Sequence, residues 1–404
     1  MSPRVIIAWL FVLSVARGEV RYAAILDDVW TKINAHFYDA SFNGVDWKAV
    51  RDRYRLRAEQ AKNLDELYDS IDEMLTGLRS SHVSFSRPSY PGKKKLARDV
   101  GVSICEIDGE AVVCNVDASP EAAKANVKAG SIVRRVDGEA APDRLRRIKE
   151  LVRRRVSVAT DRHLQTVVQQ NFFYGDADKA ADVVFERQDS QGARVQLPRT
   201  FRPRAPAFTT RRLASGYVYM RFSAWVAPMD KEVEKGLREF LDTEGLILDL
   251  RGNPGGSGEL TGRITSYFFP PNTDWGTLVS RVGQKKLNTQ QSALHYQGPL
   301  AVLVDEASAS ASENFAFLVQ EQARGALVGR ITCGCLTTTR WDHVKGGGRV
   351  GYPDAVQISA KGRKVEGKGI TPDHIVPLTL SDLRNGRDPV LERAETALQT
   401  MSRR

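Results

Sequence analysis

Residues 300–315 have the sequence LAVLVDEASASASENF, an apolar run followed by a serine-rich turn and the start of an apolar helical pattern. A short apolar run that ends at charged and small residues is typical of a strand buried on both faces. A second such run, GLILDL at residues 245–250, leads into the glycine-rich stretch RGNPGG. A helical pattern at residues 231–241 precedes the GLILDL run, and another at residues 313–321 follows the serine run. Strands that alternate with helices predict a layered α/β core over residues 205–404.

The serine run raises the question of a nucleophile, because Ser308, Ser310 and Ser312 lie two residues apart at the expected start of a helix. The alternative is a purely structural role as a helix cap, since Ser310 and Glu313 have the spacing of a capping box. The partial positive charge of a helix N-terminus would also favour an oxyanion at this position. The glycine pair of RGNPGG would let backbone N–H groups approach a ligand, as an oxyanion hole requires. Spacing alone favours the cap.

The segment from about residue 20 to 85 has helical periodicity. Apolar residues line one face of its last helix, at Leu64, Leu67, Ile71, Leu75 and Leu78. The helical period ends at SSHVSF, residues 80–85, where an alternating pattern begins. We therefore expect an N-terminal helical bundle over residues 19–87. His82 lies at its boundary, where a side chain can project into a neighbouring domain.

The first 18 residues have the pattern of a signal peptide. A short basic start precedes an apolar stretch at residues 5–13, and Ala16-Arg-Gly18 supplies small residues for cleavage. The stretch is well short of the ~20 residues that span a bilayer. The alternative is a buried N-terminal strand. We expect an exported protein, periplasmic or secreted, with no integral membrane segment after cleavage.

Composition bounds the remaining functions. The chain has 404 residues, 42% of them hydrophobic, enough for two or three globular domains of roughly 100–200 residues each. The formal charge is +10, and arginines are densest at residues 144–155. Apolar residues recur at helical spacing within that run and no aromatic residues interleave it. We interpret the run as a solvated helix face, and no nucleic-acid partner is expected.

Four cysteines are compatible with export. Cys105 and Cys114 flank the turn dipeptide Asp108-Gly109, so the two side chains can face each other across a hairpin. Cys333-Gly-Cys335 either closes a small ring or remains two thiols. Two cysteines are too few for a zinc site, and no paired histidine or cysteine lies nearby in sequence. Neither a metal nor an organic cofactor is expected.

Residues 96–200 resemble a PDZ domain. The matching pieces are GVSIC at 101–105, AVVCNV at 111–116, SPEAAKANVKAG at 119–130 and SIVRRVDG at 131–138. Asn126 and Ser131 replace the commoner Gly and Asp, and a helical insertion enlarges the domain. PDZ domains capture extended peptides by adding them as a strand at a sheet edge. The resemblance implies that protein or peptide substrates are recognised here.

The chain from about residue 25 to 380 resembles the carboxyl-terminal processing, or tail-specific, serine proteases and their relative the tricorn core protease. Besides the PDZ-like segment, the matching pieces are SSHV at 80–83, DLRGNPGG at 249–256, SASASE at 308–313 and EGKGITPD at 366–373. The resemblance implies a crotonase/ClpP-like catalytic core. It implies that Ser310 is the nucleophile and that the N–H groups of Gly256 and Ala311 form the oxyanion hole.

The general base departs from the tail-specific pattern. That branch uses a lysine within TFGK, and the aligned stretch here is TCGC, which places Cys335 at the lysine position. A thiol does not replace a neutral amine as base, because deprotonation makes it a nucleophile. The tricorn-like branch instead uses a histidine in a Ser-His dipeptide, oriented by a distant glutamate. This resemblance implies His82 as base and Glu366 as orienter, with Ser81 bridging them.

Spacing leaves other histidines open, since His343 and His374 lie closer to Ser310 in sequence. We predict a multidomain α/β serine endopeptidase that forms an acyl-enzyme on Ser310. One alternative is a catalytically inactive peptide-binding protein on the same fold, because the lysine is lost. The other is an acyl-ester or thioester hydrolase, because crotonase-like cores also build oxyanion holes.

Overall fold

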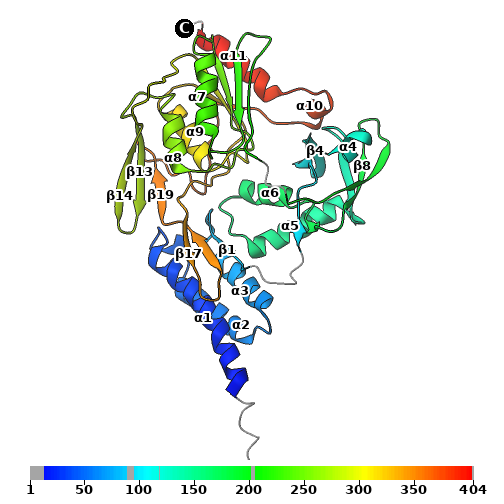
Figure 1. Cartoon of the computed structure of the whole chain (residues 1–404), viewed down its shortest axis with the longest axis vertical. Helices are drawn as coiled ribbons and strands as arrows, with labels where there is room; N and C mark the ends of the chain where they lie inside the picture. The colour runs from blue at the N-terminus through cyan, green and yellow to red at the C-terminus, as the bar shows by residue number, and fades with distance from the viewer. Residues whose placement is uncertain (1–12, 89–94, 118, 202–204, 403–404) are drawn as a thin grey trace, which may run out of the picture.

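The computed structural model describes residues 13–88, 95–117, 119–201 and 205–402 (Figure 1). Residues 1–12 of the predicted signal peptide lie outside these ranges, and its last residues begin α1 (Leu13–His36). Among the helices described, none combines the length and apolar character needed to cross a membrane. The structure is a multidomain α/β protein with several sheets, and this coarse prediction from the sequence is confirmed.

Three helices form the N-terminal part, at the lower end of the molecule in Figure 1. They are α1, α2 (Trp47–Gln60) and α3 (Leu64–Thr76), with the short η1 (Phe42–Gly44) between the first two. Side-chain caps start the later helices: Asp46 accepts the Ala49 N–H and Asn63 accepts the Glu66 N–H. The predicted apolar face of α3 is buried at Leu67, Ile71 and Leu75, as is Leu78 just beyond the helix, whereas Leu64 remains exposed.

The N-terminal helices share their core with a hairpin from the far end of the chain. Strand β1 (Ser84–Ser86) adds antiparallel to β18 (Arg349–Tyr352), which pairs with β17 (Arg340–His343). Tyr352 and Val350 are fully buried in the same cluster as the helices. This long-range pairing fixes the position of the residues just before β1, among them His82.

A second, β-rich part covers residues 95–201 and has a core of its own. Its sheet has the order β3-β4-β5-β8-β9, with β6 (Glu139–Ala140) beside β5. The strands are β3 (Val102–Ile107), β4 (Glu110–Val116), β5 (Ile132–Val136), β8 (Ala181–Glu186) and β9 (Gly192–Leu197). The helices are α4 (Pro120–Lys124), α5 (Ala141–Arg155) and α6 (Asp161–Gln170), and β2 (Leu96–Ala97) pairs with β7 (Gly175–Asp176). Cys105 and Cys114 form a disulfide across β3 and β4, as their hairpin predicts.

The third part is built on a sheet of order β10-β11-β12-β15-β16-β20, parallel from β11 onward. Its strands are β10 (Phe208–Arg212), β11 (Val218–Phe222), β12 (Leu246–Asp249), β15 (Leu300–Val304), β16 (Ala326–Gly329) and β20 (His374–Ile375). One face is covered by α7 (Met229–Glu239), α8 (Gly258–Thr265) and α9 (Ala311–Glu321), and the other by α11 (Pro389–Ser402), which follows α10 (Leu380–Arg384).

A separate small sheet, β14-β13-β19, lies beside this core. It contains β13 (Asp274–Ser280), β14 (Gly283–Asn288) and β19 (Ala355–Ile358). The carboxyl ends of β12 and β15 lie next to each other, because Asp249 pairs with Leu303 in parallel register. Ligands of open α/β sheets bind beyond such carboxyl ends. The loops that follow β12 and β15 are therefore the place to look for a site.

Candidate active site

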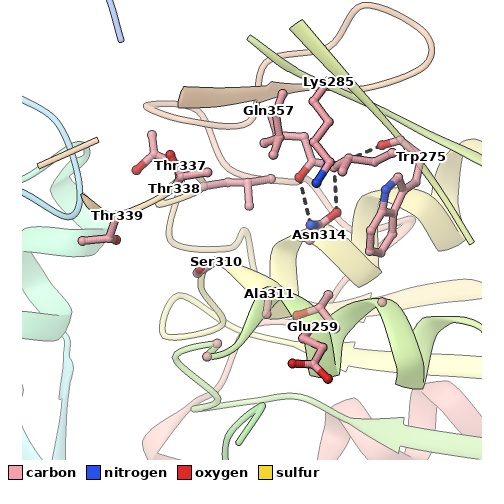
Figure 2. Close-up of a pocket in the computed structure, with 18 of the residues that line it drawn as sticks. Glu259, Trp275, Lys285, Ser310, Ala311, Asn314, Thr337, Thr338, Thr339 and Gln357 are labelled. Atoms are coloured by element: carbon pink, nitrogen blue, oxygen red, sulfur yellow. Dashed lines mark hydrogen bonds between the residues drawn. The ribbon is translucent and has the colours of Figure 1, made fainter. Parts of the chain in front are cut away.

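A cavity of about 850 Å³ opens where these loops meet. The glycine loop contributes Gly255 and Gly256, and the start of α9 contributes Ser310 and Ala311. His82 reaches the same cavity from the N-terminal part, and the β13–β14 hairpin closes another side. Figure 2 shows Ser310 at the start of its helix, between Ala311 and the Thr337–Thr338 segment. Three regions far apart in sequence thus line one space.

The structure separates the three serines of the run. Ser308 is buried and donates to the Leu250 carbonyl at 2.8 Å, and Ser312 is buried and donates to the Asn253 carbonyl at 3.0 Å. Only Ser310 lines the cavity. Its backbone has φ 54° and ψ −113°, a region that non-glycine residues seldom occupy and that concentrates at functional sites. The sharp turn presents the Ser310 side chain to the cavity.

The glycine loop lies directly against this turn. A Cβ on Gly255, where φ is +94°, would stand 2.7 Å from Ser310 Cβ and 2.8 Å from the Ala311 nitrogen. A Cβ on Gly256 would stand 2.3 Å from the Trp225 carbonyl oxygen. Within the described part of the chain, the N–H groups of Gly256 and Ala311 donate to no protein acceptor. Two free donors beside Ser310 are what an oxyanion requires.

Asn253, fully buried, fixes the glycine loop to the serine turn. Its side-chain oxygen accepts the Gly255 N–H at 3.0 Å, and its carbonyl accepts the Ala309 N–H at 3.1 Å. Its side-chain amide donates to the Phe222 carbonyl at 2.9 Å. Both loops are therefore held by one residue, whose role the sequence did not single out.

Glu313 does more than the capping role predicted for it. Its carboxylate accepts the Ser310 N–H at 3.1 Å, as a helix cap does. It also accepts the Thr332 hydroxyl at 2.6 Å and the N–H groups of Gly334 and Cys335 at 2.7 and 2.8 Å. Burial raises the pKa of Glu313 to about 7, although these donors lower it. One buried carboxyl thus joins the serine turn to residues 332–335.

The structure brings Ser81, His82 and Glu366 together. The Ser81 hydroxyl donates to Glu366 Oε2 at 2.8 Å and lies 2.7 Å from His82 Nδ1. Because the hydroxyl proton goes to the carboxylate, the Ser81 oxygen is left to accept a proton from Nδ1. This arrangement favours the tautomer with hydrogen on Nδ1, which leaves the Nε2 lone pair free. The buried Glu366 carboxylate thus orients the His82 imidazole through the Ser81 hydroxyl.

Glu366 lies buried and is held by donors from the N-terminal segment. The Ser80 hydroxyl reaches it at 2.9 Å and the Ser81 N–H at 2.7 Å, and Leu336 also donates its N–H. Burial raises the pKa of Glu366, while these hydrogen bonds lower it. Ser80 belongs to the SSHV motif at residues 80–83, but the sequence alone did not indicate a role for its side chain.

His82 has a backbone φ of 60°, so it shares with Ser310 a positive φ that is rare outside glycine. Thr337 Oγ1 lies 3.2 Å from His82 Nδ1. Burial, with a smaller contribution from the nearby His163, lowers the pKa of His82 to about 4. The imidazole is therefore neutral at physiological pH.

Ser310 and His82 line the same cavity, but no hydrogen bond joins their side chains in the part of the chain that the structure describes. Catalytic hydrogen bonds are often long before substrate binds. Two other histidines that spacing left open lie elsewhere: His343 is exposed on β17, and His374 on β20 contacts Arg393. His82 is the histidine that reaches the cavity of Ser310.

Cys335, at the aligned lysine position, forms a disulfide with Cys333. The Cys335 carbonyl accepts the Ser310 N–H at 3.1 Å, so the position still contacts the serine turn. Two lysines, Lys285 and Lys286, line the cavity from β14, but both are exposed and Lys286 pairs with Asp274 at 3.0 Å. Neither has the buried environment that a lysine base requires.

The amino-acid sequence matches two known protein-family models. Residues 216–376 match Peptidase family S41, and residues 19–76 match the Tricorn protease C1 domain. The carboxyl-terminal-processing protease of Synechocystis is 25% identical over 391 residues, which cover 92% of this chain and 85% of that protein.

Two solved structures share the fold. The structure of mature CPAF has a TM-score of 0.71 at 13% identity, covering 95% of this chain and 98% of that one. The photosystem II D1 C-terminal processing protease has a TM-score of 0.60 at 21% identity, covering 93% and 97%.

The glycine loop gives a direct test of the site. Gly255→Ala should slow the reaction of Ser310 with a fluorophosphonate probe by about 100-fold or more, the usual cost of a displaced oxyanion donor. The added Cβ has no room beside Ser310 and Ala311. Gly192→Ala, where a Cβ meets nothing within 4 Å, is the matched control. Labelling of Gly255→Ala at the wild-type rate would show that this loop does not build the site.

Proposed function

We propose that this chain, a serine-type peptidase of the carboxyl-terminal-processing group in family S41, is an exported endopeptidase. Its proposed catalytic centre consists of Ser310, His82 and Glu366. The observation that carries the proposal is the Glu366–Ser81–His82 hydrogen-bonded chain, which ends at the cavity that Ser310 lines. No lysine occupies the position that the Ser-Lys branch uses.

The reaction is acyl transfer. Ser310 Oγ attacks the carbonyl carbon of the scissile peptide bond, and its proton moves to His82 Nε2. The carbonyl oxygen becomes an oxyanion between the N–H groups of Gly256 and Ala311. As the C–N bond breaks, His82 gives the proton to the leaving amine. A water molecule, activated by His82, then hydrolyses the acyl-enzyme.

The Glu366 carboxylate supports the imidazolium that forms during this reaction. It acts through the Ser81 hydroxyl, which donates to Glu366 and accepts from His82 Nδ1–H. The negative charge is buried, where its field is screened less than at the surface. Ser81 and Glu366 are therefore positioning residues, and they keep Nε2 as the basic atom.

Substrate capture is assigned to residues 96–200, which we propose are a PDZ-like domain. The support is a groove of about 730 Å³ lined by residues of β3 and α6, among them Val102 and Gln169. Strand β3 is the edge of its sheet, so an extended peptide can add to it there. Thr160, the cap of α6, donates to the Cys333 carbonyl at 2.6 Å. The groove is thus connected to the loop that contacts Ser310.

Export is proposed from residues 1–18, with the periplasm or the exterior as destination. Two disulfides support it, because such bonds persist in oxidising compartments. The N-terminal helical bundle over residues 19–87 then has the role of presenting His82 to the core. The protein or peptide substrates need no metal or organic cofactor for the acyl transfer described.

The pH dependence of kcat/KM follows from the lowered pKa of His82. A base with a pKa of about 4 stays neutral as pH falls, so activity should persist below pH ~6.5, where an ordinary histidine becomes protonated. We expect an acid limb with a midpoint clearly below that value. In Glu366→Gln, which cannot titrate, the limb should remain but the maximal rate should fall. An acid limb at or above pH ~6.5 in the wild type would contradict a buried His82 base.

The function itself is tested by a labelled fluorophosphonate probe on the purified chain. Wild type should be labelled, and Ser310→Ala should not. His82→Ala should be labelled about 100- to 10,000-fold more slowly, because it lacks the general base. His343→Ala, which removes an exposed histidine, should react as wild type does. Circular dichroism confirms that each variant is folded.

The alternatives give different outcomes in the same experiment. An inactive peptide-binding protein would leave folded wild type unlabelled. An ester or thioester hydrolase would be labelled at Ser310 but would cleave thioesters and spare peptides in a substrate panel. Labelling that survives Ser310→Ala would place the nucleophile elsewhere.

A further inference from the structure

His163 lies beside the Cys333–Cys335 pair, although it is far from both in sequence. One side-chain ligand atom from each of the three residues lies within 4.8 Å of the others. His163 belongs to α6, and the cysteines belong to the loop that follows β16. The cysteines are each only 3% exposed. In the sequence, no paired histidine or cysteine lies near the two cysteines, but the fold brings His163 beside them as a third candidate ligand.

The donor set suits a thiophilic cation. Thiolate and imidazole are the usual ligands of Zn²⁺, and they discriminate against hard cations such as Mg²⁺. A neutral imidazole is a common metal ligand through either ring nitrogen. Two thiolates would balance the charge of a divalent cation.

The backbone around the cysteines is already fixed. The Cys333 N–H donates to the Ser308 carbonyl at 3.1 Å, and the Cys335 N–H donates to Glu313 at 2.8 Å. Arg162, next to His163, donates to the Thr332 carbonyl at 2.8 Å. The Cα atoms of the two cysteines are 5.3 Å apart. Binding would therefore require side-chain rotation and little ordering of the loop.

We propose that reduction of the Cys333–Cys335 disulfide creates a metal site in which both thiolates and His163 bind a thiophilic divalent cation such as Zn²⁺. In the reduction, a dithiol gives two electrons and two protons to the cysteine sulfurs and is itself oxidised to a disulfide. On metal binding the two thiols release their protons. With the disulfide intact, the sulfurs are bonded to each other and the site is absent.

The site has one local cost. The His163 Nδ1 accepts the Ala159 N–H at 3.3 Å, which assigns the hydrogen of the neutral ring to Nε2. A metal at Nδ1 displaces that donor, and a metal at Nε2 needs the other tautomer. In both cases one long hydrogen bond is given up for a metal–nitrogen bond.

The location gives the site a consequence, which rests on the proposed function. The Cys335 carbonyl accepts the Ser310 N–H at 3.1 Å. Rotation of Cys335 onto the cation shifts this carbonyl and with it the turn that presents Ser310. The loaded, reduced enzyme therefore acylates more slowly than the oxidised one.

Cobalt(II) is the probe, because its thiolate complexes absorb in the near-ultraviolet and visible range whereas those of Zn²⁺ do not. The full chain, reduced and freed of reductant under anaerobic conditions, should bind one equivalent of Co²⁺ with a thiolate-to-cobalt charge-transfer band. Added Zn²⁺ should abolish the band, and Mg²⁺ should not. The oxidised wild type, which has the same sequence and fold, should show no band. A reduced wild type without the band overturns the proposal.

Variants assign the ligands. The double variant Cys333→Ser/Cys335→Ser should lose the band, whereas Cys105→Ser/Cys114→Ser, which removes the other disulfide, should keep it. His163→Ala should weaken Co²⁺ binding by about tenfold or more, since even outer-shell partners of a ligand contribute that much. A band unchanged in Cys333→Ser/Cys335→Ser would place the metal elsewhere and overturn the assignment.

Fluorophosphonate labelling separates the site from its consequence. Zn²⁺ should slow labelling of the reduced enzyme but not of the oxidised enzyme. If cobalt binds and labelling is unaffected by Zn²⁺, the regulatory consequence is wrong while the metal site stands. If the enzyme is never labelled in either state, the proposed function fails, and the cobalt band still decides the site.

Discussion

The buried carboxylate of Glu366 is the constraint on which the site depends. A carboxylate removed from water must be compensated by hydrogen-bond donors, and here most of them come from a segment 285 residues earlier in the chain. The hydroxyl of Ser80 and both the N–H and hydroxyl of Ser81 converge on it. The hydrogen bonds from Ser80 and Ser81 to Glu366 therefore hold the neighbouring His82 at the cavity and favour one tautomer of its imidazole.

A second buried carboxyl, Glu313, organises the nucleophile side in the same way. It collects donors from Ser310 and from residues 332–335, and these residues in turn contact the Glu366 segment, because the Gly367 N–H donates to the Gly334 carbonyl at 2.9 Å. Thr337, two residues beyond Cys335, lies 3.2 Å from His82 Nδ1. Residues 332–337 thus contact both the Ser310 turn and His82.

Local sequence was sufficient for much of the fold. The two apolar runs predicted the buried strands β12 and β15, which pair in parallel, and the alternation of strands and helices predicted the α/β class. The serine run offered three candidates and the family resemblance implied Ser310; the structure separates it from Ser308 and Ser312, which are buried and hydrogen-bonded. What local pattern could not supply was which of the three faces a cavity, since a capping serine and a nucleophile have the same spacing.

Contacts between distant segments could not be predicted. The donors to Glu313 come from residues about 20 positions later in the chain, and His163 lies beside Cys333 only because α6 packs against the core. The bridge that Ser81 forms between Glu366 and His82 was expected only from the family resemblance. No periodicity in the sequence links residues 81 and 366. Asn253 looked like an ordinary loop residue, and its buried hydrogen bonds to both loops follow from the close approach of two turns.

A crystal structure of the fluorophosphonate-treated enzyme tests the central claim most directly. We expect a covalent bond from phosphorus to Ser310 Oγ, with the phosphonyl oxygen accepting the N–H groups of Gly256 and Ala311. His82 Nε2 should lie within hydrogen-bond distance of the adduct, with Ser81 between its Nδ1 and Glu366. An adduct on another residue, or an adduct on Ser310 with His82 out of reach and turned away from Glu366, would contradict it.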